Sequence, residues 1–172
     1  MSFFAELSAV LSTTPHRWHQ LTEHTPLDAL RRQPAHGEWS ALEVLLHLID
    51  MERDIFPVRV RAMLAGQDFP AFFPDEDGST LSVDANPAAM AAEFADLRHT
   101  NLDLLATVTE ADLTRTSTHE ELGTVTLKNL LCEWGGHDLM HMMQANQALL
   151  QPYITGSGPW LPYFEKHLVA SE

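Results

Sequence analysis

The stretch "WGGHDLMHMMQ", residues 134–144, places two histidines four residues apart within an apolar run. An α-helix advances by about 100° per residue, so the side chains of His137 and His141 lie about 40° apart on one face, one turn from each other. Lys128 and Asn146 lie on the opposite side of this helix. The residues that share the face of the two histidines are Leu130, Trp134, Gln144 and Ala148. We therefore expect both histidines to point into the interior of a helical bundle.

Four long helical patterns and few strand signals indicate an all-α protein, with one domain covering residues 1–172. The expected helices cover about residues 3–23, 40–65, 87–108 and 127–150. Ser40 and Glu43 predict a capping box at the start of the second pattern, and Pro57 predicts a kink or a break inside it. Pro152 is expected to stop the fourth helix. Together these patterns predict a four-helix bundle.

Two connections between the helical patterns are long. The first, residues 67–86, is too long for a tight helical hairpin, and a crossover there would let the second and third helices run parallel. The second, residues 109–126, has alternating threonines around Gly123 and predicts a small β-hairpin. Two short helices are expected outside the bundle, one with Thr25 as its N-terminal cap and one around residues 159–168.

The composition narrows the choice of partners. A formal net charge of −14 repels phosphate groups, so nucleic acid and anionic membrane surfaces are poor partners, whereas metal cations are attracted. The single cysteine, Cys132, excludes an intramolecular disulfide and a cluster of thiolate ligands. We expect neither a signal peptide nor a membrane-spanning segment, and a cytoplasmic location. Ten histidines among 172 residues is a high count and the first indication of a metal site.

Two histidines four residues apart on a helix can bind one divalent cation. They can equally be a hydrogen-bonded pair near the core, and the pair alone leaves both interpretations open. A zincin protease requires H-E-x-x-H with a glutamate as general base, but Asp138 holds that position and points off the face of the histidines. On the second helix, His47 lies on a mixed polar and apolar face, as expected for either a pocket wall or plain solvent exposure.

Two segments carry a resemblance to a known family. Residues 37–56, "GEWSALEVLLHLIDMERDIF", contain a Trp-Ser helix start that precedes a His-Leu pair. Residues 133–147, "EWGGHDLMHMMQANQ", contain the later H-x-x-x-H helix followed by glutamine. These motifs, their order, their spacing and the length of the chain resemble the DinB-like (DinB/YfiT) superfamily.

The resemblance implies a four-helix bundle with a long crossover between helices 2 and 3. It also implies a divalent metal ion, zinc or nickel, bound by three histidines that match His47, His137 and His141. Family members often form homodimers, and some branches are transferases or isomerases that use low-molecular-weight thiols, while many have no assigned reaction. With this resemblance, the mixed face of His47 becomes the wall of an open metal pocket.

Several residues are candidates for supporting a metal site. A ligating imidazole normally donates its second ring N–H to a carboxylate or a carbonyl. Glu43, Asp50 and Glu133 are spaced for that role, and a solvated position is the alternative for each. Gln144 could hydrogen-bond a metal-bound water or simply line the interior. Cys132 lies about 140° from the face of the histidines and is not expected to act as a nucleophile.

The remaining histidines and aromatic residues have simpler interpretations. His16 and His19, three residues apart, form the main competing histidine pair. Trp39 and Trp134 are expected to pack helices, and three phenylalanines of the long connection are expected to dock it onto the bundle or to cover a pocket mouth: Phe69, Phe72 and Phe73. Surface or loop positions are expected for five further histidines: His24, His36, His99, His119 and His167.

The leading functional hypothesis is a metal-dependent enzyme that acts on a small molecule, either a thiol S-transferase or a hydrolase. A thiol cosubstrate would bind the metal as thiolate, whereas a hydrolase would use the metal to activate water. The second hypothesis is a non-catalytic metal-binding or stress-response protein in which the ion holds the bundle together. The third is a helical interaction module whose histidines carry no metal.

Overall fold

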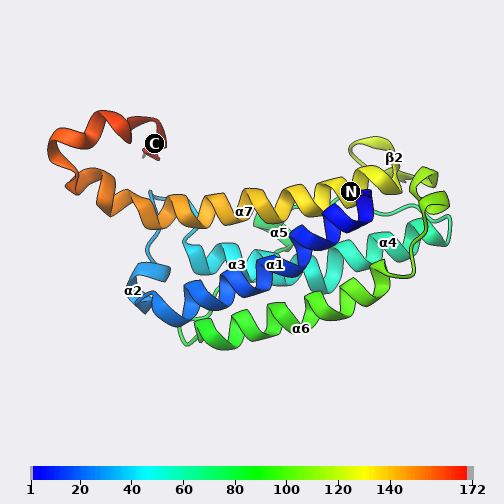
Figure 1. The fold of residues 1–172 in the computed structure, drawn as a ribbon, viewed down its shortest axis with the longest axis horizontal. Coiled ribbons are helices and arrows are strands. Elements are labelled where there is room, and N and C mark those ends of the chain that lie inside the picture. The colour runs from blue at the N-terminus through cyan, green and yellow to red at the C-terminus, as the bar shows by residue number, and fades with distance from the viewer. Residues whose placement is uncertain (1, 170–172) are drawn as a thin grey trace.

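The computed structural model describes residues 2–169, and its long helices pack side by side as a bundle (Figure 1). The α-helices are α1 (Phe3–His24), α2 (Leu27–Leu30), α3 (Ala41–Asp50), α4 (Phe56–Leu64), α5 (Pro74–Asp77), α6 (Pro87–Leu105) and α7 (Leu127–Gly156). Three 3₁₀ helices cover Glu110–Thr114, Gly158–Tyr163 and Glu165–His167. Within the described residues, no helix is long and apolar enough to cross a bilayer.

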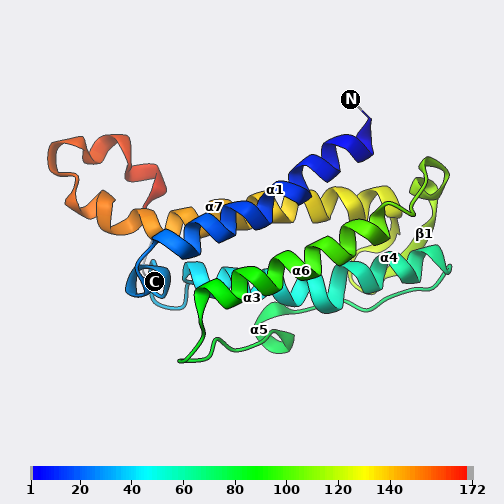
Figure 2. The same cartoon turned by 60° about the horizontal axis from the view of Figure 1, so that its bottom comes forward.

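The predicted crossover is present. Together α3 and α4 form the second long helix of the bundle, and they run in the same direction as α6, while α1 and α7 run the opposite way (Figures 1 and 2). The chain leaves α4 at Gly66, whose φ of 69° gives the left-handed conformation that ends many helices. It then returns along the bundle through α5 to the start of α6. The four-helix bundle with a crossover is therefore confirmed.

One π-helical turn (Met51–Ile55) joins α3 to α4, and in it the N–H of Phe56 donates to the carbonyl of Met51. Pro57 follows directly and has no N–H to continue a regular ladder, which explains why the predicted break falls here. A π turn holds about one residue more than an α turn, which rotates everything after it by about 100°. His47 and Arg59 would lie about 120° apart on an uninterrupted helix, and the π turn reduces this angle to about 20°.

A buried ion-pair network ties the four long helices together. From α6, Arg98 donates through Nη1 and Nη2 to both oxygens of Asp138 on α7, at 2.7 and 2.8 Å. The same guanidinium bonds the carbonyl of Leu11 in α1 and Glu52 in the π turn, each at 2.8 Å. All three charged side chains are about 1% exposed or less. Burial lowers the pKa of Arg98, but its hydrogen bonds and attraction to Asp138 and Glu52 outweigh this and raise it.

Glu52 has two further partners that complete the network. Its Oε1 accepts from Trp134 Nε1 at 2.6 Å, and its Oε2 accepts from Asn101 Nδ2 at 2.9 Å. Trp134 is fully buried and stacks on Phe56, with the ring centroids 4.8 Å apart. The expected packing role of Trp134 is thus accompanied by a polar one.

The predicted hairpin consists of β1 (Thr116–His119) and β2 (Gly123–Thr126), paired antiparallel with Thr116 opposite Thr126. Gly123 follows the turn with a φ of 73°, a conformation that glycine adopts without strain. The hairpin also contacts the crossover segment, because Thr118 donates its N–H to Asp68 Oδ1 at 2.7 Å. Segments far apart in the sequence therefore meet at the α4 end of the bundle.

Two predicted helix boundaries are wrong. Thr25 is the C-terminal cap of α1 rather than the N-terminal cap of α2. The N-cap position of α2 is occupied by Pro26. Pro152 does not stop α7, which continues to Gly156. The side chain of Gln151 bonds the backbone of His167 and Val169, so the chain end folds back onto this last turn, and these contacts offset the hydrogen bond that Pro152 removes. The predicted last helix is two short 3₁₀ helices.

Replacing Arg98 with methionine should leave two carboxylates buried without their cation. We expect Arg98→Met to lower the free energy of unfolding by about 3–5 kcal/mol. Arg61→Met is the control, because Arg61 is exposed on α4 and should change stability by no more than about 0.5 kcal/mol. Urea unfolding followed by circular dichroism measures both, and equal stability of the two variants would contradict the role assigned to Arg98.

Candidate metal centre

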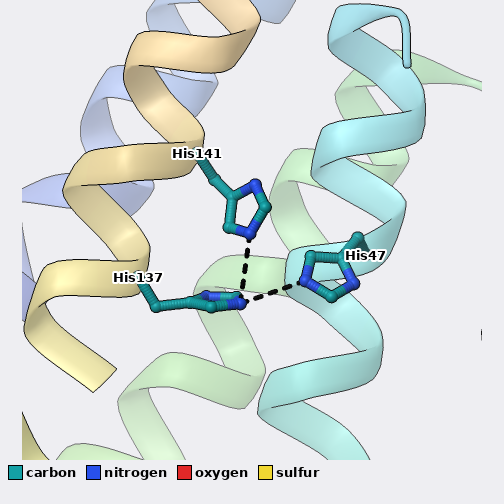
Figure 3. A group of neighbouring side chains, drawn as sticks. All are labelled: His47, His137 and His141. Carbon is teal, nitrogen blue, oxygen red and sulfur yellow. Dashed lines mark hydrogen bonds between the residues drawn. The ribbon is translucent and has the colours of Figure 1, made fainter. Parts of the chain in front are cut away.

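Three histidines from two helices converge on one point in the bundle (Figure 3). His47 comes from the last turn of α3, and His137 and His141 come from consecutive turns of α7. His137 Nε2 lies 3.0 Å from His47 Nε2 and 3.1 Å from His141 Nε2. Ligands about 2.0–2.1 Å from a shared ion lie about 3.0–3.4 Å from each other, so this spacing fits a single cation.

Hydrogen bonding among the three rings does not account for the cluster. A neutral imidazole has one N–H and one acceptor lone pair, so His137 Nε2 can form only one of its two close contacts as a hydrogen bond. If its proton sits on Nδ1 instead, that atom is buried and has no partner among the described residues. Leaving a buried polar atom unsatisfied costs about 1–3 kcal/mol. A shared cation would use all three converging Nε2 lone pairs. The proton of His137 would then remain on its unpaired Nδ1, and binding of the ion would offset that cost, so the converging lone pairs fit a metal ion.

Burial keeps the three imidazoles in the neutral form that binds metals. It is the largest cause of the shift at each ring, and neighbouring histidines reinforce it for His47 and His137. The pKa of His47 falls to about 4 and that of His137 to about 2. Burial also lowers the pKa of His141, although its hydrogen bond to Gln144 and the charge of Asp138 oppose this. No proton needs to leave these rings near neutral pH before a cation binds.

Gln144 and Trp39 hold the rings in place. His141 Nδ1 donates to Gln144 Oε1 at 2.7 Å, which fixes the tautomer that leaves the Nε2 lone pair free. Trp39 lies against two of the rings, with its centroid 5.0 Å from His47 and 6.2 Å from His141. It therefore covers the site as well as packing against the helices. Gln144 was expected to bond a metal-bound water or to line the interior, and in the structure its side chain bonds the candidate ligand His141 itself.

Two of the acidic candidates have other hydrogen-bond partners. Glu43 accepts from the N–H of Ser40 at 2.7 Å, in the predicted capping box. Asp50 accepts from the N–H and the hydroxyl of Ser79, at 2.8 and 2.9 Å, and so anchors the crossover segment to α3 one turn after His47. The negative charge of Asp50 favours the protonated form of His47, but the larger effect of burial still lowers the pKa of His47 overall.

A cavity of about 490 Å³ opens beside the three histidines. Its walls come from α3, α4, α7, the crossover segment and the β-hairpin. Glu133 lines it one turn before His137, and the loss of surrounding water raises the pKa of this carboxyl, although Arg59 opposes the rise. Phe69 and Phe72 line the cavity too, whereas Phe73 is 49% exposed. The crossover thus both docks on the bundle and closes the pocket.

The expectation of a surface or loop position for His119 is wrong, because it is a buried residue of β1. Its side chain is 7% exposed and lines the same cavity as the three histidines. The sequence placed it next to a turn, and its burial depends on the ring of Phe69, which lies 5.7 Å away and comes from the distant crossover segment. By contrast His16 and His19 are exposed on α1, where His19 lies 3.2 Å from Glu23.

Comparison with known proteins agrees with this architecture. The family model of the DinB superfamily matches residues 11–145, and the chain therefore belongs to that superfamily. A search of curated proteins gives no match. Among solved structures, YfiT from Bacillus subtilis, described as a probable metal-dependent hydrolase with an unusual four-helix bundle topology, aligns with a TM-score of 0.73 and 22% identity. The alignment covers 89% of this chain and 90% of YfiT, and at this identity it shows a shared fold.

The depressed histidine pKa values predict a loss of stability in mild acid. In the unfolded chain His47 and His137 take up protons near their ordinary value of 6.5, while the folded protein keeps both neutral down to about 4 and about 2. The unfolded state therefore binds more protons as the pH falls, and each ring should cost roughly 2 kcal/mol between pH 7 and pH 5.

Urea unfolding of chelator-treated protein at several pH values measures this slope. Between pH 7 and pH 5, the free energy of unfolding of His137→Asn should fall by roughly 2 kcal/mol less than that of wild type, because one shifted ring is absent. His16→Asn changes an exposed histidine and should show the same fall as wild type. A His137→Asn slope equal to that of wild type would contradict the shift assigned to His137.

Proposed function

We propose that this protein is a hydrolase that depends on a divalent metal ion, zinc or nickel, held by His47, His137 and His141. The observation that carries the proposal is the convergence of three neutral Nε2 atoms at the edge of a cavity large enough for a small molecule, from two buried side chains, His47 and His141, and the half-buried His137. Imidazole nitrogens are favourable donors for both Zn²⁺ and Ni²⁺. Three protein ligands leave at least one position for water or substrate, as in catalytic zinc sites.

A divalent ion at this point supplies Lewis acidity, which polarises a substrate oxygen and makes water more acidic. Glu133 supplies the general base: its carboxylate lines the cavity one turn from His137 and has no salt-bridge partner among the described residues. A raised pKa brings this carboxyl closer to the operating pH, where a base accepts a proton and returns it to the leaving group most effectively. Gln144 holds His141, and Trp39 shields the rings from bulk water.

Two considerations favour hydrolysis over thiol transfer. Two carboxylates, those of Glu121 and Glu133, line the cavity, whereas Cys132 is exposed and is not among the lining residues. YfiT, which shares the fold, is described as a probable metal-dependent hydrolase. A thiol S-transferase would need a low-molecular-weight thiol as a second substrate in the same cavity, and the activity test below includes that case.

Metal content tests the ligand assignment. Protein purified without a histidine tag should carry about one zinc or nickel ion per chain, because three neutral imidazoles share one point. His47→Ala and His137→Ala should each lose the ion, since removing either leaves only two ligands. His16→Ala and His19→Ala alter exposed histidines and should keep it. Elemental analysis of all five proteins gives the answer, and a wild type that cannot be loaded after chelation would refute the site.

Activity tests the reaction class. A panel of esters, amides, lactones and phosphoesters should include substrates that the metal-loaded protein hydrolyses and the chelated protein does not. Glu133→Gln should lower kcat by about 10²–10⁴-fold with metal content unchanged. Glu110→Gln, exposed and outside the cavity, is the matched control. Turnover of electrophiles only when a small thiol is added, with Glu133→Gln fully active, would instead identify a thiol transferase.

A further inference from the structure

Two arginines are almost fully buried in this protein, and they have very different surroundings. Arg98 is 1% exposed, and both of its terminal nitrogens bond carboxylates. Arg59, on α4, is 9% exposed and forms no salt bridge with any carboxylate among the described side chains. Its hydrogen bond to the carbonyl of Pro70, at 3.3 Å, engages only Nη2. A buried cation without a close anion is costly, and a guanidinium remains charged.

The guanidinium of Arg59 faces the cavity that contains the three histidines. Arg59 is one of the lining residues, and it lies over the ring of Phe69 with its Cζ 5.2 Å from the ring centroid. Burial lowers the pKa of Arg59, and the charge of Glu133 partly offsets this without a direct contact. The π turn is the reason that Arg59 and His47 share one wall, since it brings them to within about 20° on the same helical face.

His119 adds a second donor at the same end of the cavity. Its Nδ1 accepts from the backbone N–H groups of Glu121 and Leu122, both at 3.2 Å. A ring nitrogen that accepts has no proton, so the proton of neutral His119 resides on Nε2. Burial lowers the pKa of His119 and the positive charge of Arg59 lowers it further, although the charges of Glu121 and Glu120 oppose this. The neutral ring is a donor through Nε2.

The rest of the cavity lining is mainly apolar, and Glu121, Asn129 and Glu133 are its other polar members. The apolar side chains come from four different segments: Met51, Phe72, Leu122, Val125, Leu130 and Met140. The α-carbons of His47 and Arg59 are separated by about 18 Å along the helix axis, and the long arginine side chain spans part of that distance. The cavity therefore joins three candidate metal ligands, a mainly apolar lining and two hydrogen-bond donors, and it extends along the helix from His47 to Arg59.

We propose that Arg59 and His119 form a carboxylate-binding subsite, so that the cavity takes an elongated molecule with an apolar body and a terminal carboxylate. A guanidinium matches a carboxylate through two parallel N–H···O bonds, and the Nε2–H of His119 supplies a third donor. The reactive group at the opposite end of the molecule would then lie at the three histidines. The inference that this molecule is the substrate rests on the proposed hydrolase function. Binding of a carboxylate by Arg59 and His119 does not itself require a metal ion.

The probe for this subsite is 4-phenylbutyrate, and its neutral amide, 4-phenylbutanamide, is the matched control ligand. Calorimetric titration of chelated protein prevents the carboxylate from binding a metal ion instead. Wild type should prefer the carboxylate to the amide by about tenfold or more, because charge-assisted hydrogen bonds are the stronger ones. Arg59→Met should abolish that preference while affinity for the amide stays unchanged, which also shows that the cavity of the variant is intact.

Two further variants sharpen the test. Arg61→Met, on the exposed side of α4, should behave as wild type, and His119→Phe should weaken carboxylate binding less than Arg59→Met does. A carboxylate preference that survives Arg59→Met, or that appears only with zinc present, would overturn the subsite. Equal binding of both probes by wild type, or binding of neither, would do so as well. Because metal loading and hydrolysis are measured separately, loss of the subsite leaves the proposed hydrolase intact, and the reverse also holds.

Discussion

The arrangement of this bundle depends on the buried guanidinium of Arg98. It extends from α6 to the place where α1, the π turn and α7 meet, and its hydrogen-bond partners come from these three elements. Replacing a buried ion pair with apolar residues often costs little, but removing one partner costs much, so such a network mainly specifies which helices meet and in what register. Asp138 follows His137 directly, and Glu52 lies five residues after His47. Fixing these two carboxylates around one cation therefore also fixes the distance between the two helices that supply the candidate ligands.

Much of this architecture follows from local patterns in the sequence. The 3.6-residue period located the long helices, and the length of residues 67–86 indicated the crossover. The spacing of His137 and His141 placed them on one inward face, which depends only on helix geometry. Ser40 and Glu43 predicted the capping box that starts α3, and both of its hydrogen bonds are present. His47 was different, because its mixed face left its role open until the family resemblance assigned it.

The features that the sequence did not reveal are non-local. Arg98, Glu52 and Asp138 each look like ordinary charged residues of a solvated helix face, and only the assembled bundle buries them together. His119 is buried by a phenylalanine fifty positions away. The π turn changes the helical phase, so a wheel drawn at 100° per residue separates His47 from Arg59, although both line one cavity. Pro152 was expected to end α7 because its local cost is evident, whereas the contacts of Gln151 that offset it come from the chain end.

The buried charge of Arg59 differs in sign from the net charge of the protein, because the chain as a whole is acidic whereas this side chain is positive. A protein with a formal net charge of −14 repels anions at long range, and repels polyanions most strongly. A buried cation acts over short distances, because screening by water and salt is weakest inside the protein. In the proposed subsite, Arg59 would therefore favour a molecule with a single negative charge that fits within the cavity, whereas the net charge of the exterior opposes the approach of polyanions. Burial thus has two effects in this cavity. It keeps the three histidines neutral, and it would strengthen the attraction between Arg59 and a carboxylate in the proposed subsite.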